Sequence, residues 1–386
     1  MKKKLFIIAG EKSGDLLGSK ILAKIDKEKF TIEGIGGSLM EATGLKSRFP
    51  IKELSIMGFF EILPRAFKLL QLINDTAKYI VKTKQDIVLT IDSPSFCFRV
   101  MEKVKKLDKE NRIKKIHFVA PSVWAYRKGR TKKISKIYDR LFCILPFEPP
   151  YFEKYGLKTI FVGHPIFDKD SLEYSFNSGL VSYKEDSKII SVTAGSRVNE
   201  VKKLLPIILK SIAMLNKKYG DFTYNFLVTE DTYDMVSKAI RASGIKNTKI
   251  LIKQSDKNNS LEDSVLAIAK SGTNTLEIAA SSTPMVVIYK FNGITNFIVR
   301  ILRYFSNIKF ANLINIISAK EVIPELILNR CNSANIFNSV SNMLENKQLR
   351  LEQISTGIKV LEKLGFNGNN SSSARIVKEI YRLTDA

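Results

Sequence analysis

Short apolar segments alternate with longer amphipathic segments along most of the chain. The short segments are rich in β-branched and aromatic residues, as buried strands are, and the longer ones have the 3.6-residue period of helices. This alternation predicts parallel sheets covered by helices. In the first half of the chain the predicted strands are residues 5–9, 32–35, 87–91, 116–119, 141–145 and 160–162.

The alternation stops at a polar stretch, residues 168–186, and then starts again. The second series of predicted strands is 189–193, 224–228, 249–252, 265–269 and 285–288. We therefore predict an α/β protein with two Rossmann-like domains, residues 1–168 and 187–365, which face each other across a cleft. A last helix, within residues 370–386, is expected to return to the first domain.

The composition agrees with two folded domains and adds a strong positive charge. A chain of 386 residues is longer than one core usually supports, and 45% hydrophobic residues exclude the disordered class. The 62 Lys and Arg residues against 38 Asp and Glu residues give a net charge of +24. Such a charge attracts nucleic acid, phosphorylated metabolites or an anionic lipid surface, and by itself does not choose among them.

Disulfides, metal sites and membrane spans are not expected. Cys97, Cys143 and Cys331 lie far apart, without the spacing of a metal site or a disulfide framework. His117 lies within a predicted strand, which leaves too few ligands for a metal. The N-terminus reads as a first strand rather than a signal peptide, and no stretch has the roughly 20 apolar residues of a membrane-spanning helix. Contact with a membrane would be peripheral.

The loop after the first predicted strand opens a helix and contains Glu11, Ser13, Gly14 and Asp15. The dinucleotide pattern G-x-G-x-x-G is absent and two acids would oppose a phosphate, so this loop suits the hydroxyl groups of a sugar better. Farther along, Asp92 follows a strongly apolar strand. It is either a general base for an attacking hydroxyl or the cap of the next helix.

Two later loops also join a predicted strand to a helix. In the first, Gly195, Ser196 and Arg197 suit a phosphate at a helix N-terminus, although a plain turn with a surface arginine has the same pattern. In the second, Glu277 would bind a ribose diol or serve only as an acid at the helix start. The small residues of that loop, which would admit a pyrophosphate, are Ser271, Gly272, Thr273 and Thr275.

Two further segments have a functional and a structural interpretation. Trp124 and Arg127 combine aromatic and basic character, which suits a phosphorylated, partly apolar ligand or a core-packed loop before a basic helix. His164 stands at a strand end, where it would contact an acceptor or a phosphate, or fix the linker.

Two helical segments indicate contact with lipid. Residues 56–73 are too apolar for an ordinary solvated helix, and residues 296–307 have a basic amphipathic pattern. Such helices lie on a bilayer surface, or else are buried in a core or a dimer interface. In the first segment the candidate lipid-contacting residues are Phe59, Phe60, Leu63, Phe67 and Leu70.

An ordered set of short motifs resembles the lipid-A-disaccharide synthase family of GT-B glycosyltransferases. The set extends from residue 10 to about residue 328. In order, its members are A-G-E-x-S-G-D-x-L-G, G-x-G-G-x-x-M, M-G-F-x-E-I-L, P-S-V-W-A-Y-R, I-L-P-F-E, F-V-G-H-P, G-S-R-x-x-E, S-G-T-x-T-L-E and A-N-L-I.

The resemblance implies a GT-B fold and an inverting transfer of 2,3-diacylglucosamine. The donor would be UDP-2,3-diacylglucosamine and the acceptor the 6-hydroxyl of 2,3-diacylglucosamine 1-phosphate. The resemblance also implies that no metal or other cofactor is needed, and that the protein is cytoplasmic and bound peripherally to the inner membrane. Positive charge and a helix dipole would then stabilise the departing diphosphate.

The resemblance also assigns roles to particular residues. Asp92 matches the proposed base, Glu11 and Asp15 match acids of the acceptor-side loop, and the helix around residues 59–70 matches the membrane-contacting segment. The remaining acceptor-side candidates are Ser13, Gly14, Trp124, Arg127 and His164. The donor-side matches are Arg197, Glu200, Glu277 and Asn312, beside the small residues of the two later loops.

The chain departs from the family pattern near Asp92. Where D-x-P-D-F-N is usual, Ser95 and Cys97 replace the second acid and the asparagine. Ala194 stands where proline is usual, which changes the stiffness of that loop more than its chemistry.

Two other functions are compatible with parts of the pattern. A related GT-B transferase of peptidoglycan precursor synthesis would also use a UDP-aminosugar, but the first loop and the segment 121–127 argue against it. A nucleic-acid-binding protein would explain the charge, but its basic residues would be expected on one recognition surface. No nucleic-acid partner is expected, and the sequence does not separate monomer from homodimer.

Overall fold

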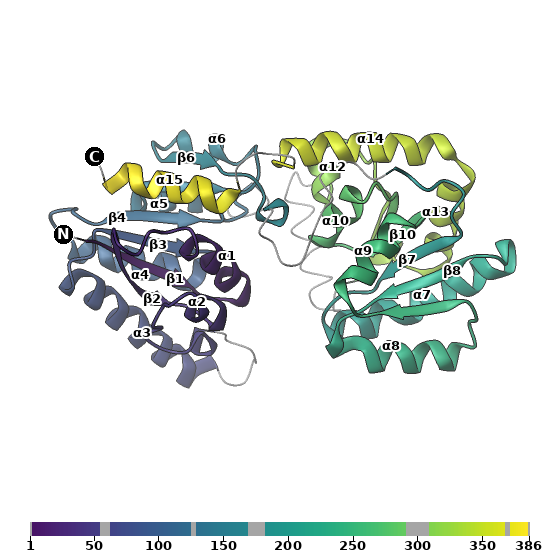
Figure 1. Cartoon of the computed structure of the whole chain (residues 1–386), viewed down its shortest axis with the longest axis horizontal. Helices are drawn as coiled ribbons and strands as arrows, with labels where there is room; N and C mark the ends of the chain where they lie inside the picture. Colours follow the sequence, from purple (N-terminus) through teal and green to yellow (C-terminus); the bar gives the residue numbers. More distant parts are fainter. Residues whose placement is uncertain are drawn as a thin grey trace. The chain divides into compact units, whose positions relative to one another are not determined.

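A computed structural model gives the structure of residues 2–54, 62–124, 129–168, 182–290, 309–366 and 371–384, with residues 62–66 described by their backbone alone. The chain forms two compact units, Met1–Ser171 with Leu364–Ala386, and Leu172–Lys363. Each unit contains a six-stranded sheet with helices packed against it (Figure 1).

The first unit has the strand order β2-β1-β3-β4-β5-β6, with all of its pairings parallel. Its strands are β1 (Lys3–Ala9), β2 (Phe30–Ile35), β3 (Ile87–Ile91), β4 (Lys114–Phe118), β5 (Arg140–Cys143) and β6 (Lys158–Phe161). Its helices are α1 (Lys12–Leu22), α2 (Ser38–Ala42), α3 (Ile62–Lys82), α4 (Pro94–Leu107), α5 (Arg130–Ile137), α6 (Pro149–Glu153) and α15 (Ser372–Thr384), with short 3-10 turns at Ile51–Leu54 and Pro165–Phe167.

The second unit has the strand order β12-β11-β10-β7-β8-β9, also with parallel pairings. Its strands are β7 (Ile189–Thr193), β8 (Thr223–Leu227), β9 (Thr248–Leu251), β10 (Leu266–Lys270), β11 (Met285–Tyr289) and β12 (Glu325–Ile327). Its helices are α7 (Val198–Tyr219), α8 (Glu230–Ser243), α9 (Gln254–Glu262), α10 (Asn274–Ala280), α12 (Leu313–Ser318), α13 (Ser333–Glu345) and α14 (Lys347–Lys363), with a 3-10 turn at Leu328–Arg330.

The sequence pattern predicted this α/β fold correctly. Every predicted strand is present, and the observed ends differ from the predicted ends by at most two residues. Strand β12 was not predicted, because three residues are too few to produce a recognisable alternation. The predicted cleft between the domains stays a prediction.

The alternation of side chains along β1 explains the two cores of the first unit. Leu5 and Ile7 are buried in one cluster with residues of α1 and α15, and Phe6 and Ile8 are buried in another with residues of α3, α4 and α5. Because neighbouring residues of a strand point to opposite faces, both faces of the sheet are covered.

The C-terminal helix α15 belongs to the first unit although it follows the second in the sequence. At its start, the buried carboxylate of Asp168 accepts hydrogen bonds from the backbone N and the Oγ of Ser372, both at 2.7 Å. Near its end, Tyr381 packs edge-on against Phe30 and its hydroxyl accepts from the backbone N of Asp26. Helix α15 is therefore anchored at both ends.

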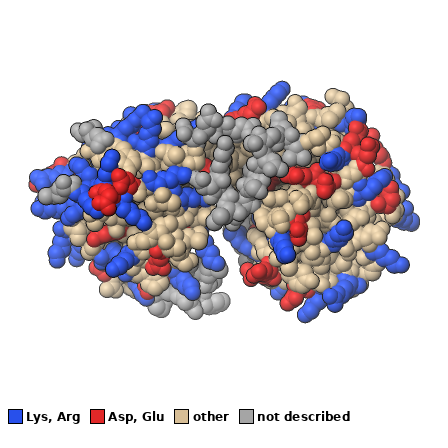
Figure 2. Space-filling view, in the orientation of Figure 1, with Lys and Arg blue, Asp and Glu red and all other residues tan. Residues whose placement is uncertain are grey.

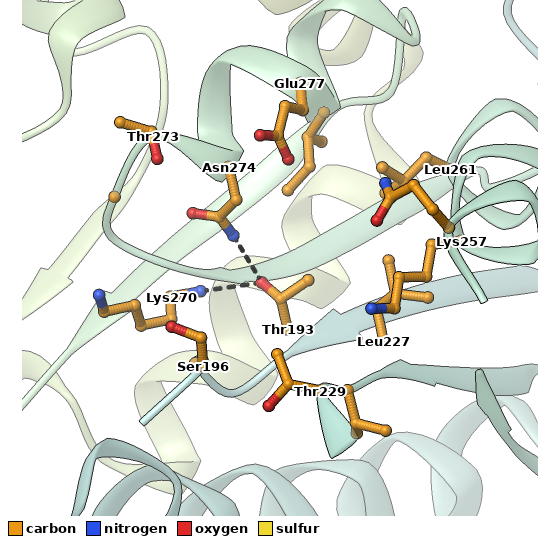
Figure 3. A pocket seen from close by; sticks show the side chains of 15 residues that line it. Thr193, Ser196, Leu227, Thr229, Lys257, Leu261, Lys270, Thr273, Asn274 and Glu277 are labelled. Carbon is orange, nitrogen blue, oxygen red and sulfur yellow. Dashed lines mark hydrogen bonds between the residues drawn. The ribbon is translucent and has the colours of Figure 1, made fainter. Parts of the chain in front are cut away.

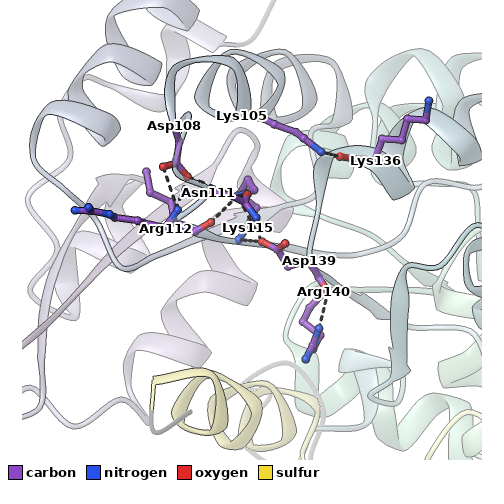
Figure 4. Close-up of polar contacts among 9 residues, drawn as sticks. Lys105, Asp108, Asn111, Arg112, Lys115, Lys136, Asp139 and Arg140 are labelled. Carbon is purple, nitrogen blue, oxygen red and sulfur yellow. Dashed lines mark hydrogen bonds and ion pairs between the residues drawn. The ribbon is translucent and has the colours of Figure 1, made fainter.

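A buried lysine stabilises the amino-terminal edge of the first sheet. The Lys115 side chain is 1% exposed, and its ammonium donates to Oδ1 of Asn111 at 2.8 Å and to the carbonyl of Ile113 at 2.6 Å (Figure 4). The carboxylates of Asp108 and Asp139 lie 3.8 and 3.6 Å away. These carboxylates and hydrogen-bond acceptors compensate the buried charge of Lys115, which indicates a structural role for this lysine.

Lys and Arg side chains are spread over both units. Figure 2 shows them on many elements of the visible face rather than on a single one, with Asp and Glu among them. A dispersed distribution does not resemble the single basic surface expected of a nucleic-acid-binding protein.

Asp15 has a structural role that the sequence analysis did not anticipate. Its side chain is 5% exposed, and its carboxylate accepts from the backbone N atoms of Gly37, Leu39 and Met40 at 2.8, 3.1 and 3.0 Å. These amides lie at the start of α2, where no earlier carbonyl is available to them. Its assignment to the catalytic residues is corrected accordingly: Asp15 joins α1 to α2.

We expect the Asp15→Asn variant to lose about 2 kcal/mol of folding stability, the range for hydrogen bonds to a buried charged group. Trp124, the only tryptophan, reports on the first unit, so urea unfolding followed by its fluorescence is the measurement. Glu41→Gln is the matched control, because Glu41 is an exposed acid of α2, the helix whose first amides Asp15 accepts from. Equal midpoints for the two variants would contradict the structural role.

Candidate functional site

In the first unit, candidate residues from two loops meet at the carboxyl ends of adjacent strands. Strand β1 pairs with β2 on one side and with β3 on the other, so the strand order reverses there. Ligands of such sheets bind beside that reversal. Ser13 Oγ donates to Oδ2 of Asp92 at 3.2 Å, and the exposed Glu11 precedes α1 in the same loop.

The backbone at Asp92 has an uncommon conformation. Asp92 and Ser93 have φ angles of 50° and 46°, in the left-handed region, which costs of the order of 1 kcal/mol or more per residue and is concentrated at functional sites. The turn is held by a hydrogen bond from the backbone N of Asp92 to the carbonyl of Phe118.

The helix cap is a different residue. Ser93 occupies the N-cap of α4, and within the described part of the chain no backbone amide donates to the Asp92 carboxylate. The structural alternative for Asp92, a helix cap, is therefore wrong, and its partly exposed carboxylate is available for chemistry.

The two departures from the family pattern differ in their surroundings. Ser95 is exposed on the first turn of α4. Cys97 is fully buried, and burial, followed by the negative charge of Asp92, raises the pKa of its thiol. A thiol that stays protonated does not compete with Asp92 for a proton at neutral pH.

Gly14 serves packing in the same loop. It is buried, and a Cβ at this position would lie 3.3 Å from both the Cβ of Ala9 and the carbonyl oxygen of Ile91. The absence of a side chain lets α1 approach the ends of β1 and β3. Gly14 therefore has a packing role, and its contact with an acceptor stays a prediction.

Trp124 is held by a buried acid. Its Nε1 donates to Oε1 of Glu148 at 3.3 Å, and its ring packs edge-on against Phe147. Glu148 is 1% exposed, and burial raises the pKa of its carboxyl to about 7. The N–H edge of the indole ring is therefore bonded within the protein, which agrees with the interpretation of this segment as a core-packed loop. Arg127 lies outside the described residues.

His164 fixes the point at which the chain returns to the first unit. Its Nδ1 accepts from the backbone N of Ile166, and its own backbone N donates to the carbonyl of Leu364 at 2.8 Å. Burial lowers the pKa of the imidazole to about 4, so the ring is neutral at pH 7. These contacts agree with one of the two interpretations of His164, in which it fixes the linker.

The second unit has a pocket at the carboxyl ends of β7, β8 and β10 (Figure 3). Its volume is about 210 Å³, enough for part of a ligand rather than for a whole drug-sized molecule. Of the predicted donor-side residues, the pocket brings together Gly195, Ser196, Gly272, Thr273 and Glu277.

Thr193 connects the loops that line this pocket. Its Oγ1 accepts from the backbone N of Lys270 at 3.2 Å and from Nδ2 of Asn274 at 2.9 Å. One hydroxyl at the end of β7 thus joins the end of β10 to the start of α10. On the other side of the pocket, burial lowers the pKa of Lys257, and the charge of Glu277 opposes that shift.

A carboxylate and two cations lie beside the first donor-side loop. Gly195 has a φ of +120°, and a Cβ there would lie 2.8 Å from Oε2 of Glu200, so the loop requires glycine. Oε1 of Glu200 lies 3.2 Å from Nζ of Lys270 and 3.5 Å from Nη1 of Arg197. The Arg197 side chain is 81% exposed.

Two predicted donor-side residues form structural contacts outside the pocket lining. Thr275 is 1% exposed and its hydroxyl donates to the carbonyl of Gly272. Asn312 is 2% exposed; it caps α12 by accepting from the backbone N of Ile314 and donates its own backbone N to Glu325. Both side chains are buried in their own loop or helix start, where they position the backbone, and a direct contact of either one with the donor stays a prediction.

The predicted lipid-contacting helix is described from residue 62 onward. Phe67 and Leu70 are 72% and 44% exposed, whereas Ile73 and Ala77 of the same helix α3 are buried. Phe59, Phe60 and the second amphipathic segment lie outside the described residues, as does the side chain of Leu63. An exposed apolar face on an otherwise packed helix indicates an interaction surface.

Two features are absent from the described residues, a helix able to span a membrane and a side-chain cluster able to hold a metal ion. Among the helices that these residues form, none has the length and apolar character needed to cross a membrane. They also contain no group of three or more His, Cys, Asp and Glu side chains able to hold a metal ion.

Several pocket residues were missed by the sequence analysis, namely Thr193, Thr229, Lys257, Lys270 and Asn274. Thr193, Thr229 and Lys270 lie at or just after strand ends, so the rule that ligands bind at carboxyl ends could have identified them. Lys257 lies on α9, which has no local signal of a binding site.

Comparison with known proteins agrees with the motifs. A family profile described as lipid-A-disaccharide synthetase matches residues 5–380. The lipid-A-disaccharide synthase of Rickettsia prowazekii is 41% identical over 385 residues, covering 98% of this chain and 99% of that protein. The lipid-A-disaccharide synthase of Rickettsia bellii is 43% identical over 374 residues, covering 95% of both.

Solved structures resemble the chain in fold. A UDP-GlcNAc 2-epimerase from Neisseria meningitidis has a TM-score of 0.58 at 15% identity and covers 99% of this chain and 100% of its own. UGT73P12 from Glycyrrhiza uralensis has a TM-score of 0.61 at 11% identity and covers 100% and 96%. The fold is that of GT-B glycosyltransferases and these epimerases, and from the profile and the close relatives the chain belongs to the lipid-A-disaccharide synthetase family.

Proposed function

We propose that this protein is a hexosyltransferase that joins two acylated glucosamines. The donor is UDP-2,3-diacylglucosamine, the acceptor is 2,3-diacylglucosamine 1-phosphate, and the products are the lipid A disaccharide 1-phosphate and UDP. The observation that carries this proposal is the family relationship over residues 5–380. That range includes the loop after β1, the loop after β3 and the residues of the donor-side pocket.

Asp92 is the proposed base. Its carboxylate is partly exposed at the end of β3, it accepts from Ser13, and no backbone amide among the described residues donates to it. Glu11 lies in the same loop as Ser13. The acceptor 6-hydroxyl transfers its proton to Asp92 while its oxygen forms a bond to the anomeric carbon. The bond from that carbon to the diphosphate oxygen breaks, and its electron pair leaves with UDP, which inverts the configuration.

The pocket of the second unit is the proposed site of UDP. Gly195, Ser196, Gly272 and Thr273 give the phosphates close access to backbone amides, and Glu277 is placed for the ribose hydroxyls. Helix α7 begins at Val198, so its positive end faces the first of these loops. Arg197 adds a guanidinium that remains in contact with solvent.

The proposed location is the cytoplasmic surface of the inner membrane. Phe67 and Leu70 supply exposed apolar area on α3. The exposed Lys68 between them pairs with Glu53 at 3.2 Å, so the apolar side chains rather than this cation are the proposed contact. Acyl chains of both substrates would then remain close to the bilayer.

We expect Asp92→Asn to lower kcat by about a hundredfold to ten-thousandfold, the usual contribution of a general base. Its thermal stability should change little, because among the described residues Ser13 alone bonds to the carboxylate. UDP release from the two acylated substrates is the assay. Ser95→Ala is the control, an exposed position on the same turn, and full activity of Asp92→Asn would exclude Asp92 as the base.

We expect Arg197→Ala to raise the KM for the UDP-sugar by about fivefold, as for one solvent-screened ionic contact of roughly 1 kcal/mol. Initial rates at varied donor and saturating acceptor provide the measurement. A KM equal to that of the unmodified protein would remove Arg197 from the donor site.

We expect the double variant Phe67→Asp, Leu70→Asp to bind anionic vesicles at least about tenfold more weakly, since burying one such side chain is worth roughly 1.5–3 kcal/mol. Co-sedimentation with vesicles of phosphatidylglycerol and phosphatidylethanolamine gives the partition coefficient. Leu351→Asp is the control, an apolar side chain of α14 that is 39% exposed. Equal partition of both variants would argue against α3 as the contact.

A further inference from the structure

Lys270 lies beside the donor-side loops, although none of the sequence motifs contains it. It is the last residue of β10, it lines the pocket, and its side chain is 18% exposed (Figure 3). Its Nζ would lie 3.6 Å from a Cβ on Gly272, while Oε2 of its partner Glu200 would lie 2.8 Å from a Cβ on Gly195. The ion pair therefore lies against both glycine loops.

The ammonium of Lys270 is held in place from several directions. The backbone N of Lys270 is bonded to Thr193, its Nζ lies 3.2 Å from Oε1 of Glu200, and the same Nζ lies 5.3 Å from the centre of the Tyr289 ring. An ammonium has three N–H donors, and Glu200 is its one ion-pair partner among the described residues, which leaves donors for a ligand. A fixed cation with donors to spare is suited to an anion that enters the pocket.

The local charge balance depends on this lysine. Lys270 and Arg197 both contact Glu200, so two cations and one carboxylate leave a net charge of +1. Without Lys270 the group would be neutral. Arg197 is largely exposed and its field is screened by salt, whereas the field of a mostly buried ammonium is screened much less.

We propose that Lys270 binds the diphosphate of the UDP-sugar and stabilises the negative charge that develops on it as the sugar departs. This inference rests on the proposed function and adds a donor-binding residue to it. Glu200 is then a positioning residue, which orients Lys270 and Arg197 toward the two glycine loops. The electron pair of the broken bond stays on the diphosphate oxygen, so the need for a nearby cation is greatest at that moment.

The test compares UDP with uridine, which lacks the phosphates. Dissociation constants for both ligands are measured by ligand-observed NMR on the full-length protein and on Lys270→Met, Lys270→Arg and Lys253→Met. Lys253 precedes α9, is exposed and does not line the pocket, so its variant removes a charge of the same sign without touching the site.

We expect Lys270→Met to bind UDP about tenfold to a hundredfold more weakly, the range for one charge-assisted hydrogen bond. Its uridine affinity should be unchanged, which also verifies that the pocket is folded. Lys270→Arg should retain UDP affinity within a few fold and Lys253→Met should match the unmodified protein. The slope of log Kd for UDP against log salt concentration should be smaller for Lys270→Met.

Other outcomes would overturn the inference in distinct ways. Equal losses for UDP and uridine would make Lys270 a structural residue. An unchanged UDP affinity together with a raised KM for the acylated sugar phosphate would assign it to the acceptor phosphate instead. If the unmodified protein bound no UDP, the proposed function itself would fail, whereas UDP binding that survives Lys270→Met would remove only the role of Lys270.

Discussion

Parallel strand pairing is the constraint on which the other features depend. Every pairing described in the two sheets is parallel, so each strand must be followed by a crossover, and all carboxyl ends of a sheet lie at one edge. Loops that are about 80 residues apart in the sequence, such as those of Ser13 and Asp92, are thereby brought within one hydrogen bond. The opposite edge is left for structural contacts, and there Lys115 is buried with its full set of partners.

The acids of the first unit show how burial separates structure from chemistry. Asp15 and Asp168 are both 5% exposed and both accept from backbone amides at the start of a helix. Glu148 is buried too, and its raised pKa reflects the cost of keeping it charged. Asp92 differs from these acids: it is partly exposed, it has a left-handed backbone conformation, and in the described part of the chain no amide donates to its carboxylate. A carboxylate whose oxygens already accept hydrogen bonds within the protein has few lone pairs left to bind a substrate.

The sequence predicted the fold better than the roles of single residues, for a physical reason. Strand positions follow from local periodicity, which is why all predicted strands are present. The role of Asp15 depends on the amides of Gly37 to Met40, more than 20 residues away, and no local pattern encodes that contact. Lys270 lies just after the predicted strand 265–269 and no motif included it, because its partner Glu200 lies on α7 and the two are brought together by the pairing of β7 with β10. Two of the motif loops line the pocket, but the motifs did not indicate that Lys270 lines it as well.

The net charge of +24 and the charge of the donor site act at different distances. Lys and Arg are dispersed over both units, and charges on an exposed surface are screened beyond roughly 8 Å at physiological salt. They can draw the protein toward an anionic bilayer but cannot select one ligand over another. Beside the pocket, Glu200 cancels one of the two cations that contact it, Lys270 and Arg197, so this group of three side chains keeps a net charge of +1, and Lys270 is its mostly buried cation. Because a fixed cation need not reorganise when a diphosphate leaves, one well-placed ammonium can contribute more to the reaction than the many solvated charges around it.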